Sequence, residues 1–105
     1  MKAYHRHVAD LLDEAAIEEA LRRLPGWERD GDTLVRAYLR RDWLDAIALL
    51  DAVAPEAERR NHHPDVAITG YRNVTFRLTT HSKGGITNRD VDLAIWIEEL
   101  AAQRR

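Results

Sequence analysis

The chain has 105 residues, which fits one domain and is too short for two independent hydrophobic cores. Its formal charge of -2 at pH 7, with acids and bases interspersed, argues against direct nucleic-acid binding, which usually needs a basic face. The absence of cysteine excludes disulfides, thiol nucleophiles and thiolate metal sites. No apolar run approaches the roughly 20 residues that span a bilayer, and the first residues lack a signal-peptide core. We therefore expect a cytoplasmic protein that makes no membrane contact.

The first half of the chain predicts a helix followed by a hairpin. We expect residues 1–11 to be a flexible N-terminus and residues 12–105 to form the single domain. Asp13 is suited to cap the first helix, and Pro25-Gly26 should stop it. The turn signal Asp30-Gly31-Asp32 then separates two extended stretches.

A second helix should begin after Asp42, whose side chain can cap it, and should reach Asn61 before Pro64. Pro55 conflicts with this helix because proline removes one backbone hydrogen bond, so we expect a kink there. The predicted buried stripe of this helix contains Trp43, Ala46, Ile47, Leu50, Val53, Ala54 and Ala57.

The second half predicts another hairpin and a last helix. Two strands should meet near Arg72, and the second alternates Val74, Phe76 and Leu78 with polar residues. The stretch from Thr87 to Asp90 resembles a capping box that opens the final helix, with Asp90 as a capping acid. This element order favours an α+β fold with a four-stranded antiparallel sheet and three helices packed on one face.

Histidines are the only residues whose pattern indicates a site. His62 and His63 stand side by side where the second helix should end, and His81 stands where a strand should end. Ends of neighbouring elements share one rim in a two-layer domain, so we expect these three imidazoles to cluster. His5 and His7 lie near the N-terminus, where incidental residues are common.

Four interpretations of this cluster are compatible with the residues alone. The histidines can simply complete a helix C-terminus, where the dipole favours imidazolium. A metal site is possible, although adjacent helical residues point about 100° apart and no HExxH motif occurs. Imidazoles that titrate near neutrality can serve general acid–base catalysis. A serine hydrolase would have to use Ser82 beside His81, without a nucleophile elbow.

A longer pattern around these histidines resembles the signature of the pterin-4a-carbinolamine dehydratases. Its members, at the gaps of the family, are Glu58, His62, His63, Pro64, Tyr71, His81 and Asp90. The flanking stretches LPGWERDG and THSKGGITNRDVDLA also resemble the family, and the likeness covers about residues 12 to 101. It implies the same α+β fold and removal of water from 4a-hydroxytetrahydropterin to give quinonoid dihydropterin, with no metal or organic cofactor, in support of tetrahydropterin recycling.

The resemblance also implies roles for individual residues. His62 and His81 correspond to the acid–base pair, and His63 to a residue that holds and orients the pterin. The remaining predicted substrate-binding residues are Asn61, Thr79, Thr80, Ser82, Glu58 and Trp27. Glu58 lies four residues before His62, so it could orient that imidazole, and Tyr71 is interpreted as structural. Glu58 as a solvated charge and Trp27 as core filler are the alternatives.

Some relatives act as dimerisation cofactors of a transcription factor, so a protein-interaction module and a non-catalytic pterin-binding protein remain the alternative functions. Relatives also form dimers or tetramers, and an exposed edge strand in so small a sheet favours self-association. We therefore expect a homodimer or homotetramer that binds a pterin as its small-molecule partner.

Overall fold

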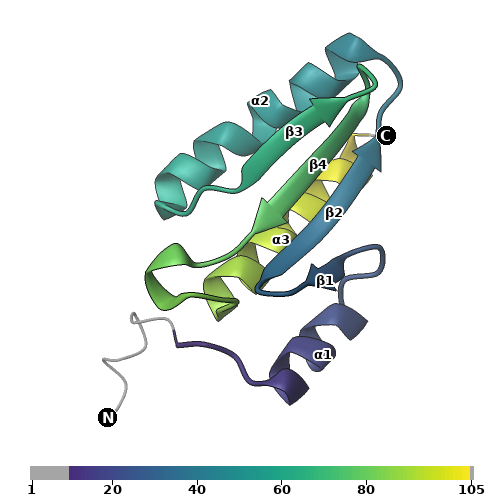
Figure 1. The fold of residues 1–105 in the computed structure, drawn as a ribbon. Helices are drawn as coiled ribbons and strands as arrows, with labels where there is room; N and C mark the ends of the chain where they lie inside the picture. Colours follow the sequence, from purple (N-terminus) through teal and green to yellow (C-terminus); the bar gives the residue numbers. More distant parts are fainter. Residues whose placement is uncertain (1–9, 105) are drawn as a thin grey trace.

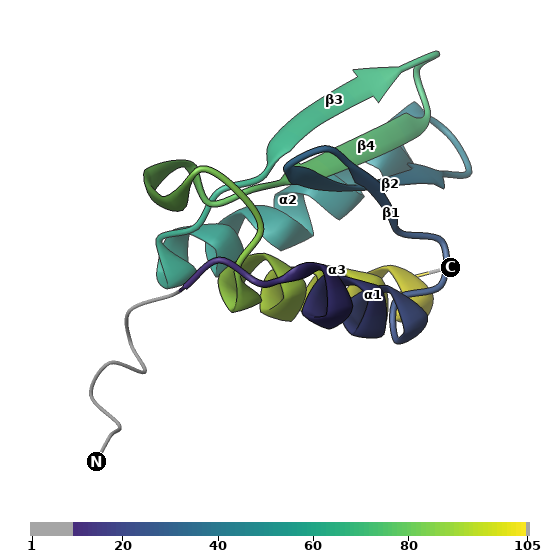
Figure 2. The same ribbon diagram turned by 60° about the horizontal axis from the view of Figure 1, so that its bottom comes forward.

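The computed structural model describes residues 10–104, so the predicted flexible segment 1–11 lies almost wholly outside the described residues, as do His5 and His7. The elements follow the order α1 (Glu14–Arg22), β1 (Glu28–Asp30), β2 (Thr33–Leu39), α2 (Trp43–Arg60), β3 (Asp65–Thr69), β4 (Asn73–Leu78), the 3₁₀ turn η2 (His81–Lys83) and α3 (Asn88–Gln103). The strands form one antiparallel sheet in the order β1-β2-β4-β3 (Figure 1). All three helices lie on one side of this sheet, as Figure 2 shows, so the predicted α+β arrangement is confirmed.

The alternation along the central strand decides which face of the sheet is buried. Val74, Phe76 and Leu78 of β4 are fully buried, whereas Thr75 and Arg77 between them remain partly exposed. Residues opposite one another on paired antiparallel strands share a face, and the partners of Val74 and Leu78 on β2 are Tyr38 and Leu34. The apolar side of the sheet therefore packs against the three helices, and the other side is left open.

Short-range signals place the starts of the helices where the sequence predicts them. The carboxylate of Asp13 accepts a hydrogen bond from the Ala16 backbone N–H at 2.8 Å, and Asp42 accepts one from Asp45 at 2.8 Å. Each bond satisfies a backbone donor that the first turn of a helix leaves without an intrahelical partner. The predicted N-caps of α1 and α2 are confirmed.

The buried stripe of α2 differs from the predicted one. Ala46, Val53 and Ala57 are buried as expected, together with the unpredicted Leu49, but Trp43 is 50% exposed and Ala54 is exposed. Apolar side chains surround much of this helix, so its own pattern does not select one face. Contact with β4 and α3 makes the selection. The helix runs from Trp43 to Arg60 without a break at Pro55, which is exposed.

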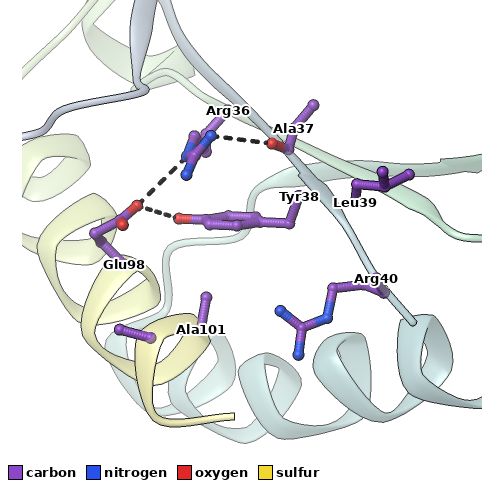
Figure 3. Close-up of a pocket in the computed structure, with 8 residues that line it drawn as sticks. Arg36, Ala37, Tyr38, Leu39, Arg40, Glu98 and Ala101 are labelled. Carbon is purple, nitrogen blue, oxygen red and sulfur yellow. Dashed lines mark hydrogen bonds and ion pairs between the residues drawn. The ribbon is translucent and has the colours of Figure 1, made fainter. Parts of the chain in front are cut away.

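A carboxylate in the second half of α3, Glu98, contacts side chains of β2 and of the segment before β1 (Figure 3 shows its contacts with β2). One oxygen of Glu98 accepts hydrogen bonds from the Trp27 indole at 3.1 Å and the Tyr38 hydroxyl at 2.6 Å, and it pairs with Arg36 at 3.5 Å. These contacts tie β2 and the β1 approach to α3, beside a cavity of about 220 Å³.

Tyr38→Phe should reduce stability at neutral pH by about 1 kcal/mol, because it removes a largely buried hydrogen bond. Burial, and then the hydrogen bond to Glu98, raises the pKa of Tyr38 above its ordinary value. A raised pKa stabilises the folded state fully below the unfolded value, near 10, and this contribution is lost as the pH rises through the folded value. Urea unfolding at about pH 8 and about pH 11 should therefore show the gap between wild type and variant narrowing, and a constant gap would contradict this account.

Candidate active site

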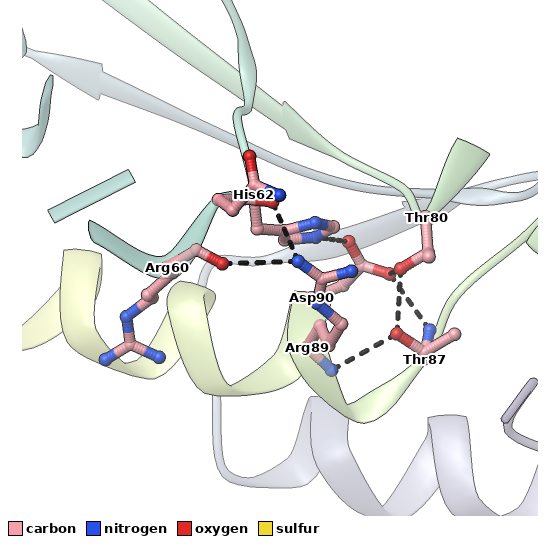
Figure 4. Close-up of polar contacts among 7 residues, drawn as sticks. Arg60, His62, Thr80, Thr87, Arg89 and Asp90 are labelled. Atoms are coloured by element: carbon pink, nitrogen blue, oxygen red, sulfur yellow. Dashed lines mark hydrogen bonds and ion pairs between the residues drawn. The ribbon is translucent and has the colours of Figure 1, made fainter. Parts of the chain in front are cut away.

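The last turn of α2 is closed by a backbone motif that places the two adjacent histidines. Asn61 adopts a left-handed conformation with φ of 51°, its N–H bonds the Glu58 carbonyl at 3.0 Å, and the His62 N–H bonds the Ala57 carbonyl at 3.0 Å. This pair of bonds is a Schellman motif, in which a left-handed residue reverses the chain at a helix end. The guanidinium of Arg89 on α3 donates to the Asn61 carbonyl at 2.8 Å and to the Arg60 carbonyl at 3.2 Å (Figure 4).

Asn61 is predicted to bind substrate, and the structure gives it this backbone role with an exposed side chain. Asn61→Ala should lower the free energy of unfolding by about 1 kcal/mol, because a β-carbon is strained in the left-handed region. Asn61→Gly should keep or slightly raise stability, since glycine adopts this region freely. Urea titrations followed by circular dichroism compare the three proteins, and equal losses in both variants would exclude a backbone cause.

His62 points inward and meets a carboxylate from α3. Its Nε2 lies 2.6 Å from Oδ1 of Asp90, and the two side chains are only 8% and 0% exposed. Among residues 10–104, no hydrogen bond is made to Nδ1 of His62. Every fully buried side-chain nitrogen or oxygen in this range has a hydrogen-bond partner, so Nδ1 cannot be one of the fully buried atoms. Nδ1 is therefore open to the surface, while Nε2 is held in the interior.

Asp90 is fixed by the strand end as well as by its own helix. Its Oδ2 accepts hydrogen bonds from the Thr80 hydroxyl at 2.8 Å and from the Thr87 backbone N–H at 2.9 Å, and the two threonine hydroxyls lie 2.7 Å apart. The bond from Thr87 belongs to the capping box that opens α3. Asp90 thus caps its helix, as predicted, and also contacts His62, which its position in the sequence does not show.

Glu58 pairs with His63, and not with His62 as its spacing in the sequence indicates. Its carboxylate lies 2.8 Å from Nε2 of His63, and both side chains are exposed, by 81% and 56%. The left-handed Asn61 ends the helical spacing before His62, so the four-residue rule no longer applies across it. A largely apolar groove of about 210 Å³ runs beside this pair between α2 and β3, lined by Leu50, Val53, Ala54, Ala57, Glu58, His63, Pro64 and Val66.

His81 begins η2 directly after Thr80, and its side chain is exposed. Consecutive α-carbons are about 3.8 Å apart, so the hydrogen bond from Thr80 to Asp90 brings the backbone of His81 close to the carboxylate that holds His62. Of the other predicted residues on this segment, Thr79 is partly buried and Ser82 is exposed. The three histidines therefore come from segments that meet around Asp90.

Trp27 is the predicted site residue that is not brought to this cluster. It is 4% exposed in the core and bonds Glu98, which is eight residues beyond Asp90 on α3 and so roughly 12 Å further along the helix axis.

Among residues 10–104, no group of three or more histidine, aspartate or glutamate side chains is arranged to hold a metal ion. None of the helices in this range is long and apolar enough to cross a membrane.

Two residues of the site were not predicted as such. Thr87 supplies a hydroxyl beside Thr80, and Arg89 holds the end of α2. The capping-box pattern contained the signal for Thr87, because it marked this residue as the start of a helix whose first turn carries Asp90. No local pattern indicates the contact of Arg89 with carbonyl groups almost 30 residues earlier in the chain.

Comparison with known protein families tests the family that the residue pattern predicts for this chain. The family model described as pterin 4 alpha carbinolamine dehydratase matches residues 10–100. The chain belongs to the pterin-4a-carbinolamine dehydratase family. All residues of the histidine cluster lie within the matched range, and the family predicted from the residue pattern is confirmed.

Relatives in this family are close over nearly their whole length. A protein of Nocardia farcinica is 51% identical over 92 residues, which are 88% of this chain and 96% of the relative. A protein of Thermomicrobium roseum is 48% identical over 91 residues, or 87% of this chain and 97% of the relative. Both carry the provisional name pterin-4-alpha-carbinolamine dehydratase.

A solved structure also agrees with the fold. The crystal structure of a transcriptional coactivator/pterin dehydratase from Brucella melitensis matches with a TM-score of 0.83 and 31% identity, over 88% of this chain and 99% of that one. A pterin dehydratase-like RuBisCO assembly factor of the alpha-carboxysome shares 23% identity at a TM-score of 0.60, which shows a common fold alone.

Proposed function

We propose that the protein removes water from 4a-hydroxytetrahydropterin, giving quinonoid dihydropterin, by general acid–base catalysis with His62 and His81. The observation that carries the proposal is the buried contact between Nε2 of His62 and Asp90, a carboxylate that also accepts a hydrogen bond from Thr80, the residue before His81. This arrangement lies within the range that matches the dehydratase family. Regeneration of tetrahydropterin for aromatic amino-acid hydroxylases would be the use of this reaction.

The reaction needs two proton transfers, which two imidazoles can share. One takes a ring N–H proton of the pterin, and the electron pair of that bond moves into the ring as the carbon–oxygen bond breaks. The other gives a proton to the departing hydroxide, which leaves as water. A positioned acid or base typically contributes about 10²–10⁴-fold, and imidazole is suited to both roles near neutral pH.

Binding of the pterin is assigned to groups around this pair. His63, held by Glu58 at the surface, is suited to contact a flat polar ring that lies over the cluster. Thr79 and Ser82 offer hydroxyls on either side of His81, whereas Thr80, also predicted to bind substrate, is buried with its hydroxyl bonded to Asp90 and could act only indirectly. Asn61 could add only a surface contact, because its side chain is exposed and its main function is in the backbone. Trp27 could act only indirectly, through α3.

Stopped-flow turnover of 4a-hydroxytetrahydropterin tests the proposal, with the rate in buffer subtracted. We expect the wild-type protein to accelerate dehydration well above the spontaneous rate. A rate no faster than buffer would remove the enzyme and leave the non-catalytic alternatives. Varying the substituent at C6 of the pterin would then define which member of the substrate class is preferred.

An interaction module is the second candidate, and one surface feature favours it. Four of the exposed large apolar side chains gather where α2 begins and the β3–β4 turn lies: Leu39, Trp43, Leu44 and Tyr71. This end of α2 is opposite to the end that carries His62, so binding there need not compete with catalysis. An interaction that survives His81→Ala would show that the two roles are separate.

Self-association is expected for the same reasons. Among residues 10–104 the sheet ends in the strands β1 and β3, each with one edge that no strand of this range pairs. The exposed apolar side chains add area that a partner could cover. We propose a homodimer or homotetramer. Light scattering at micromolar concentration should give at least twice the 12.1 kDa of one chain, and a monomer mass would exclude it.

A further inference from the structure

The hydrogen bonds around Asp90 define which way each proton points, and this has a consequence for His62. Thr87 donates its backbone N–H to Oδ2 of Asp90, and a backbone N–H can only donate. The Thr80 hydroxyl bonds the same oxygen, so its single hydrogen is directed there. An ionised carboxylate only accepts, which leaves Oδ1 as an acceptor for His62 at 2.6 Å.

Thr87 completes this set of hydrogen bonds, and no two donors face each other in it. Thr80 has already directed its hydrogen to Asp90, so the hydrogen in the 2.7 Å contact between the two hydroxyls comes from Thr87. Thr87 is then free to accept the backbone N–H of Arg89 at 3.2 Å. Every donor thus has an acceptor, and all of these groups are buried except the partly exposed Arg89.

We propose that Thr80 and Thr87 are positioning residues that lock neutral His62 in the tautomer with the proton on Nε2, so that His62 exchanges protons with the substrate through Nδ1. The inference rests on the proposed function for its catalytic meaning. A carboxylate behind an imidazole also stabilises the imidazolium that forms when the opposite nitrogen takes a proton. In this tautomer the bare Nδ1 of His62 can accept the pterin ring N–H proton, and His81, the other member of the proposed pair, would then protonate the leaving hydroxide.

The tautomer can be read without any substrate. Two-bond ¹H–¹⁵N correlation spectra of the uniformly labelled protein distinguish the protonated from the bare ring nitrogen of each histidine, and His62→Gln assigns the signals. We expect the spectrum of the neutral His62 ring to show Nε2 protonated and Nδ1 bare. A proton on Nδ1 instead would overturn the proposal, whether or not the protein proves to be a dehydratase.

The role of the hydroxyl is tested by substitution. Thr80→Val removes one of the two donors that fix the orientation of the Asp90 carboxylate. The hydrogen bond to His62 should weaken, so we expect a mixture of His62 tautomers and a kcat lower by ~10–100-fold with KM changed far less. Thr80→Ser keeps the hydroxyl, so it should show the wild-type spectrum and rate. If Thr80→Val fails to fold, the spectrum and rate of Thr80→Ser are compared with those of the wild-type protein instead. Thr75→Val, on the open face of β4, is the matched control. A wild-type tautomer and rate in folded Thr80→Val would show that the hydroxyl does not position His62.

Discussion

Replacing His81 by alanine is expected to lower the kcat of dehydration by about 10²–10⁴-fold, the usual contribution of a positioned proton donor. Because the side chain of His81 is exposed at the start of η2, its loss should change the free energy of unfolding by no more than about 0.5 kcal/mol. The rate and the stability therefore separate in this variant, which excludes general damage to the fold as the cause.

Lys83→Ala is the matched control for this measurement, since Lys83 is an exposed residue of the same short turn. It should turn over 4a-hydroxytetrahydropterin at the wild-type rate. Stopped-flow traces at equal protein concentration compare the three proteins. If His81→Ala is as fast as Lys83→Ala, His81 is not the acid, and the departing hydroxide must receive its proton from another group or from solvent.

Replacing Asp90 by alanine should have the largest effect on stability. The substitution leaves the Thr80 hydroxyl, the Thr87 backbone N–H and Nε2 of His62 without their buried acceptor. Each orphaned donor typically costs about 1–3 kcal/mol, and loss of a helix cap adds to this, so we expect a total loss of ~3–5 kcal/mol. Activity should also fall, because His62 loses the group that orients it.

Asp92→Ala offers a control on the same helix, because Asp92 is exposed two residues further along. Urea unfolding should leave it within about 0.5 kcal/mol of the wild-type protein. Asp90→Asn provides a second measurement if the alanine variant does not fold. Its amide oxygen can still accept the Thr87 N–H, but its NH₂ group would then face His62 and favour the opposite tautomer. A stable and fully active Asp90→Asn would mean that the carboxylate matters only as a cap.

Some expectations about contacts failed for a definite physical reason. Glu58 was expected to orient His62 because the two residues are four apart, yet the helix ends at Arg60 and the left-handed Asn61 turns the chain away. Helical spacing predicts neighbours only while the helix continues. Glu58 therefore reaches His63, and Asp90 takes His62.

The case of Trp27 is different, because its position in the family pattern was assigned to the substrate pocket. The indole ring packs in the core, and its N–H donates a hydrogen bond to Glu98. An aromatic residue after Pro-Gly fits either setting, and nothing in the local sequence distinguishes a pocket wall from core packing. The choice depends on where α3 passes, which is a tertiary property.

The sequence by itself determined those features that depend on residues close to one another along the chain. The caps at Asp13 and Asp42, the hairpin turns, and the alternation of Val74, Phe76 and Leu78 follow from backbone geometry and from the two-residue period of a strand. The family pattern belongs here too, since its residues and gaps could be read directly.

Only the tertiary structure decided which residues meet across the domain. The apolar face of α2 had several possible orientations, and packing against the sheet selected Leu49 over Trp43. The contact between His62 and Asp90, 28 residues apart, arises because the end of α2 and the start of α3 meet beside the end of β4. A buried donor must find an acceptor wherever the fold supplies one, and the linear sequence does not show which residue that will be.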